Sequence, residues 1–123
     1  MTGDRKLTDF RRWAISVLDL LSAEPERQLR YLQTSGVGAD EMLLQFDDLL
    51  HVARARVADG SLNGEDYRLL QAVGEIVNSV SESPEGIWAE GALEEAIEWE
   101  ELRVASATAK SDLGLSWGRE FSD

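Results

Sequence analysis

Residues 10–21 read FRRWAISVLDLL, and the spacing of the apolar side chains in this stretch decides the fold class. The apolar residues recur every three or four positions: Phe10, Trp13, Ala14, Val17, Leu18 and Leu21. An α-helix turns once in about 3.6 residues, so this spacing places all of them on one broad face. We therefore expect an amphipathic helix over residues 8–21, with the hydroxyl of Thr8 capping its first turn.

Four later segments repeat the helical spacing, and capping residues mark where several of them begin or end. They cover residues 25–36, 39–58, 63–80 and 91–110. Gly36 and Gly60 suit the C-terminal ends of helices. Asn63 suits an N-cap, and Asp66 can complete a capping box with it. No stretch alternates apolar and polar residues in the way that predicts a strand.

The chain has 123 residues, a length that fits one domain with a single core. We predict an all-α fold: a single-domain antiparallel bundle of about five helices over residues 1–123. The tail over residues 113–123 has no clear period and is expected to pack loosely. Trp13 is expected in the core, together with Phe46, Leu50, Tyr67, Leu70, Trp88 and Trp99.

Composition argues against several kinds of function. The chain has 12 Lys and Arg against 24 Asp and Glu, a formal net charge of −12. We therefore expect no direct binding to nucleic acid or to an anionic membrane, because both require a basic patch. The absence of cysteine excludes disulfides, thiol catalysis and cysteine-ligated metals. No uninterrupted apolar run is long enough to span a membrane. No apolar stretch of the kind found in secretion signals follows the first charged residues, so a cytoplasmic location is expected.

The sequence contains no recognisable catalytic constellation. His51 is the single histidine, and we expect an ordinary surface histidine. The alternative is a general base paired with Asp47 or Asp48, since Asp47 lies four residues earlier. Neither a nucleophile elbow nor a phosphate-binding glycine loop is present. We predict that the protein is not an enzyme and uses no cofactor and no metal.

The acidic residues are concentrated in the second half of the chain. Residues 1–60 have 8 basic and 10 acidic side chains, a net −2, whereas residues 61–123 have 4 and 14, a net −10. On the helix expected near residues 91–110, one face carries Glu90, Glu94, Glu98 and Glu101. This stripe is either a solvated helix face or a patch that binds a basic partner, where it would speed association and select the partner.

Two further features have both a structural and a functional interpretation. Asp47 and Asp48 are adjacent on a helix, so they point about 100° apart and cannot form one chelating site. They are either one structural and one solvated carboxylate or a second acidic contact. Trp117 lies between glycines in the tail, where it could be an exposed interface anchor or fold back onto the bundle.

An ordered set of motifs over residues 39–113 resembles a known family. The motifs are Phe46-Asp47-Asp48, the DGSLN loop at residues 59–63, a helix with Leu70 and Ile76, Trp88 with Ala92 and Leu93, and Trp99 with Leu102, Arg103 and Ala107. In this order they resemble small acidic helical proteins that bacteria encode beside polymorphic and contact-dependent growth inhibition toxins. Such proteins are immunity proteins, which neutralise a cognate toxin domain by binding it.

The resemblance implies a stoichiometric inhibitor whose acidic face docks into the basic groove of a nucleic-acid-cleaving toxin. The partner-binding residues expected on this basis are Asp47, Asp48, Glu90, Glu94, Glu98, Glu101 and Trp117. Two other classes stay open: an acidic adaptor, chaperone or phage-type inhibitor of another basic protein, and a self-associating helical protein whose acidity serves solubility. The oligomeric state stays open as well.

Overall fold

The computed structural model describes residues 2–88 and 90–117, and the side chains of residues 9–84, 86–88 and 91–117. The described chain forms six α-helices and one 3-10 helix. They are α1 (Thr2–Ser22), α2 (Pro25–Ser35), α3 (Asp40–Ala58), α4 (Gly64–Ser81), η1 (Glu85–Trp88), α5 (Glu90–Glu95) and α6 (Ile97–Ser116). No strand occurs within this described part, so the predicted all-α fold is confirmed.

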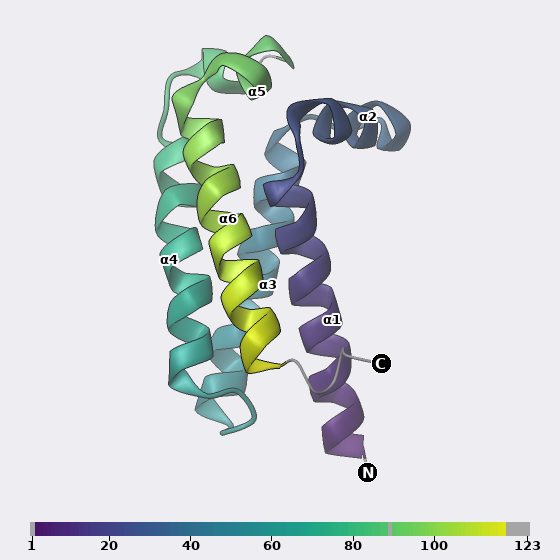
Figure 1. Cartoon of the computed structure of the whole chain (residues 1–123), viewed down its shortest axis with the longest axis vertical. Helices are drawn as coiled ribbons and strands as arrows, with labels where there is room; N and C mark the ends of the chain where they lie inside the picture. The colour runs from purple at the N-terminus through teal and green to yellow at the C-terminus, as the bar shows by residue number, and fades with distance from the viewer. Residues whose placement is uncertain (1, 89, 118–123) are drawn as a thin grey trace.

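The four long helices form an antiparallel bundle (Figure 1). Along the chain α1, α3, α4 and α6 run alternately up and down, and each packs against two others, in the circular order α1, α3, α4, α6. The short elements α2, η1 and α5 lie at one end of the bundle, where α2 packs against α5. We call this the cap end and the opposite end the open end.

The bundle interior holds the apolar faces that the helical spacing predicts. Phe46, Leu70 and Trp99 are each 0 % exposed, which confirms their expected burial. The other three residues expected in the core, Leu50, Tyr67 and Trp88, are half-buried against it. The prediction for Trp13 is wrong: this side chain is 36 % exposed, because it lies at the edge of α1 beside a hollow that opens toward α3.

Helix ends agree with the sequence where a local capping group sets them. Gly36 and Gly60 adopt the left-handed backbone conformation, with φ of +68° and +83°, and follow α2 and α3. Asn63 caps α4, because its Oδ1 accepts a hydrogen bond of 2.8 Å from the Asp66 amide. The N-cap predicted at Thr8 is wrong, since α1 begins at Thr2.

The single helix predicted over residues 91–110 is divided in two. Helix α5 ends at Glu95, Ala96 is extended with ψ of 131°, and α6 begins at Ile97. Leu93 and Trp99 are both fully buried, yet six residues of one continuous helix would rotate their side chains about 120° apart. The break at Ala96 lets both side chains point into the core.

Helix α6 also extends further than its predicted end at residue 110. Residues 113–116 continue the helix to Ser116, and Leu113 is 0 % exposed. The first part of the expected loose tail is therefore helical and packed. Residues 118–123 lie outside the described residues.

Candidate interaction surface

A shallow apolar groove runs between α4 and α6. Its half toward the open end is lined by Leu69, Ala72, Val73, Ile76, Ala105, Thr108, Ala109 and Asp112. Its half toward the cap end is lined by Ile76, Ile97, Glu100, Glu101, Val104 and Ala105. Because Ile76 and Ala105 line both halves, the two hollows form one surface, which we call the α4–α6 groove.

The groove displays large apolar side chains that a helix normally buries. Ile97 is 67 % exposed and Val104 is 57 % exposed. Leu115, which is 82 % exposed, points within about 20° of both around the α6 axis, at about 100° per residue. A row of exposed apolar residues on one helix face is typical of an interaction surface, whereas isolated ones are ordinary.

Three carboxylates line the groove, and all three belong to α6: Glu100, Glu101 and Asp112. Among the described side chains, Glu101 and Asp112 form no ion pair. Glu100 does, since its Oε2 accepts from Arg103 Nε at 3.1 Å. The residues of α4 that line the groove are apolar, so the groove is acidic along its α6 side.

The two basic residues of α6 make most of their polar contacts with α1 and α2. Lys110 Nζ lies 2.7 Å from Asp19 Oδ1 on α1, and Arg27 of α2 pairs with the other oxygen of Asp19 at 2.6 Å. Hydrogen bonds from Arg27 and then Lys110 hold the pKa of Asp19 below its usual value. Arg103 is buried, donates to Gln28 Oε1 at 3.1 Å and also pairs with Glu100. Of the carboxylates that line the groove, these two bases therefore pair with Glu100 and leave Glu101 and Asp112 without an ion pair among the described side chains.

The structure separates the glutamates that the sequence places on one helical stripe. Glu94 belongs to α5, whereas Glu98 and Glu101 belong to α6 beyond the break at Ala96, so the continuous stripe is wrong. Glu94 and Glu101 are exposed and Glu98 is half-buried. Glu90 begins α5, and its side chain lies outside the described residues.

Asp47 and Asp48 lie on α3, which packs against α1 and α4. Both are exposed, but the structure does not bring them to the α4–α6 groove. Partial burial of the Asp47 carboxylate raises its pKa, and the negative charge of Asp48 raises that pKa further. His51, on the same helix, is exposed as expected.

Trp117 cannot be the exposed anchor that the tail position suggested, because it is only 2 % exposed. Its Nε1 donates to Asp66 Oδ2 at 2.7 Å, and Ser116 Oγ donates to Asp66 Oδ1 at 2.8 Å. The guanidinium of Arg11 lies 5.3 Å above the Trp117 ring. Asp66 therefore does not complete a capping box. Its buried carboxylate ties the end of α6 to the start of α4.

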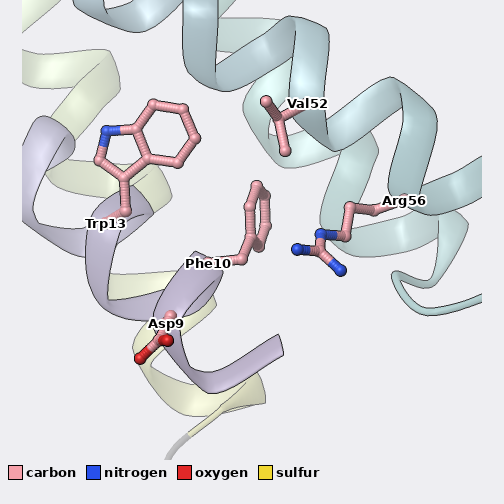
Figure 2. Close-up of a pocket in the computed structure, with 5 residues that line it drawn as sticks. All are labelled: Asp9, Phe10, Trp13, Val52 and Arg56. Atoms are coloured by element: carbon pink, nitrogen blue, oxygen red, sulfur yellow. The ribbon is translucent and has the colours of Figure 1, made fainter. Parts of the chain in front are cut away.

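A second hollow lies between α1 and α3 (Figure 2). Figure 2 shows Phe10 and Trp13 of α1 facing Val52 and Arg56 of α3, with Asp9 at the edge. The Phe10 and Trp13 rings meet edge to face at 6.3 Å, and the Arg56 guanidinium lies 5.8 Å from the Phe10 centroid. This hollow is lined by one acid and one base. The charged residues that line the α4–α6 groove are instead all acidic.

Sequence reasoning found the glutamates but missed the apolar row beside them. The missed residues are Ile97, Val104 and Leu115, which fall outside the apolar faces that fill the core. Their spacing of seven and then eleven residues on α6 is visible in the sequence. Recognising it as a separate face requires knowing that the helix restarts at Ile97.

Among the described residues, no group of three or more acidic or histidine side chains is placed to hold a metal ion. None of the helices formed by these residues is long and apolar enough to cross a bilayer. No protein-family model, curated protein or solved structure matches the chain. The resemblance to immunity proteins therefore stays a prediction.

Proposed function

We propose that the protein binds a basic protein domain and neutralises it stoichiometrically, as an immunity protein does with its cognate toxin. The observation that supports this most is the α4–α6 groove, where exposed apolar residues lie beside Glu101 and Asp112, which form no ion pair among the described side chains. A chain with a net charge of −12 and this surface is suited to a cationic partner.

The mechanism requires no catalytic group. A domain that cleaves nucleic acid must present cationic side chains to the phosphates of its substrate. An acidic surface competes for the same side chains and excludes the substrate. The unpaired carboxylates, Glu101 among them, would steer the encounter and select the partner, while the apolar centre would provide most of the affinity.

Gene order and growth rescue test the proposal directly. An immunity gene lies directly downstream of its toxin, so the upstream open reading frame is the candidate partner. Co-expression should restore growth to cells that the candidate inhibits, and the two proteins should co-purify. If the neighbouring protein is neither toxic nor bound, the immunity function is contradicted.

Charge reversal tests where the partner binds. The double variant Glu94→Lys, Glu101→Lys should slow association with the co-purified protein by about tenfold or more at low salt, and flatten its salt dependence. Asp47→Lys with Asp48→Lys makes the same change in net charge on α3. If the α3 variant slows association and the first variant does not, the binding site is on α3.

A further inference from the structure

We propose that the α4–α6 groove holds a single amphipathic helix of the partner, with its apolar face in the groove and Lys or Arg side chains along the edge that faces α6. This inference rests on the proposed function and specifies how the partner is recognised. Four features of the groove support it: its length, the shape of its floor, the hydrogen-bonded backbone of its walls, and its charge.

The length of the groove fits a helix. On α6 its lining runs from Ile97 to Asp112, 15 residue steps or about 22 Å at about 1.5 Å per residue. An occupant helix of about 18 residues, or five turns, would cover this length and reach Leu115, which points the same way one turn further along α6. Its anchors would recur three, four and seven residues apart, as in other helices that bind in grooves.

The floor of the groove is low because its residues are small. Ala72 of α4 and Ala105 and Ala109 of α6 line the groove together with the larger Leu69, Ile76 and Val104. Small residues between larger ones leave holes into which the side chains of a third helix can insert. An added helix would cover Ile76, Val104 and the alanines together.

The walls of the groove favour a helix over an extended segment. Both walls are α-helices, whose backbone groups away from the ends are hydrogen-bonded within each helix. An extended segment would find no backbone partners there and would bury its own amides and carbonyls on an apolar floor. A helix satisfies those groups internally, so it can bury its apolar face at lower cost.

The charge around the groove selects a basic helix and disfavours a second copy of this chain. Two copies facing each other would bring Glu100, Glu101 and Asp112 of one against acidic residues of the other. Like charges brought together across an interface are unfavourable, and each chain has a net charge of −12. Lys or Arg on the edge of the occupant that faces α6 would instead meet Glu101 and Asp112, which form no ion pair among the described side chains.

Three synthetic peptides of about 18 residues, the length that matches the row, test the proposal. The first is a helix-forming peptide with Leu on one face and Lys on the other. The second replaces every Leu with Ser and keeps the charge, and the third replaces every Lys with Glu and keeps the apolar face. Titration calorimetry should detect binding of the first peptide alone.

Groove variants locate the binding. Ile97→Ser with Val104→Ser should weaken binding of the Leu/Lys peptide by about tenfold or more, because a few anchor residues contribute most of the binding energy of an interface. Leu44→Ser is the matched control, because Leu44 is 53 % exposed on α3, close to the 57 % of Val104, and lies outside the groove. The control should bind the peptide as the unaltered protein does.

Three results would overturn the groove proposal, and they differ in what they mean for the proposed function. If the Ser/Lys peptide binds as tightly as the Leu/Lys peptide, charge alone attracts the partner and the function stands without the groove. If the groove variant binds normally, the site lies on another face. If sedimentation shows a dimer that Ile97→Ser with Val104→Ser dissociates, the groove joins two copies. Failure of growth rescue, by contrast, contradicts the immunity function and leaves peptide binding unaffected.

Discussion

Helix α6 contributes to two seams of the bundle with opposite chemistry. Toward α1 and α2 it is closed by polar contacts: Lys110 pairs with Asp19, and Arg103 donates to buried Gln28, which itself donates to the Leu20 and Leu21 carbonyls. Toward α4 it leaves Ile97 and Val104 exposed beside unpaired carboxylates. One helix thus has a side held by polar contacts and a side that exposes apolar residues.

The contrast explains how an acidic chain concentrates its charge. Helix α6 has two bases, Arg103 and Lys110, and both contact α1 or α2, although Arg103 also pairs with Glu100. These contacts stabilise the bundle, whereas the charged residues that line the groove are all acidic: Glu100, Glu101 and Asp112. Acidity that served solubility alone would not require apolar side chains at its centre.

The largest expected effect comes from Trp99→Ala, which removes the side chain that fixes α6 at the cap end. Trp99 is 0 % exposed, donates from Nε1 to the Ile87 carbonyl at 2.8 Å and meets the Trp88 ring edge to face. We expect the free energy of unfolding to fall by about 3–5 kcal/mol in a urea titration. Trp13→Ala, at a 36 % exposed position, should cost clearly less. Equal losses would show that the core assignment is wrong.

A smaller loss is expected at the C-terminal end of α6, where Trp117 contacts Asp66 of α4. Trp117→Phe keeps an aromatic ring but removes the Nε1 donor, so Asp66 Oδ2 loses its hydrogen bond in a buried position. Leaving a buried acceptor unpaired costs about 1–3 kcal/mol, measurable by urea unfolding. Trp88→Phe makes the same change at a half-buried ring. If both variants lose equally, the Asp66 contact does not stabilise the end of α6.

Local patterns predicted most of the bundle, because they depend on groups close together in sequence. The apolar spacing of residues 10–21, the left-handed glycines at 36 and 60 and the Asn63 cap all appear in the structure. The break at Ala96 could not be predicted in the same way. It depends on where Trp99 finds its partner, the Ile87 carbonyl, which only the folded cap end supplies.

The candidate surface was predicted only in part, for the same reason. The charge of Glu94 and Glu101 is visible in the sequence, but their separation on two helices follows from the break. Trp117 was ambiguous because its burial depends on Asp66, 51 residues away. The apolar floor of the groove is created where α4 and α6 meet, so neither helix shows it alone.

Removing the shared carboxylate of the closed seam tests its ion pairs. Asp19→Asn should lower the free energy of unfolding by about 1 kcal/mol at neutral pH, because Asp19 pairs with both Arg27 and Lys110 at positions that solvent partly screens. The folded-state pKa of Asp19 lies below its ordinary 3.8. The stabilisation is therefore fully present above 3.8 and disappears as the pH falls through the lowered pKa. A stability difference that persisted unchanged below that pH would show that the pairing is not the cause.

The smallest effect is expected from removing one carboxylate on the side of α6 that faces α4. Glu101→Gln eliminates one exposed charge that has no ion pair among the described side chains and that follows Glu98 by three residues on α6. Like charges at this spacing repel, so the free energy of unfolding should rise by a few tenths of a kcal/mol. Urea titrations of Glu101→Gln and Asp19→Asn at low salt should thus shift in opposite directions, and 0.5 M salt should reduce both shifts. A loss in Glu101→Gln comparable to that in Asp19→Asn would mean that Glu101 stabilises the fold. In that case the negative charge at the groove would be structural, and the contrast between the two seams of α6 would not hold.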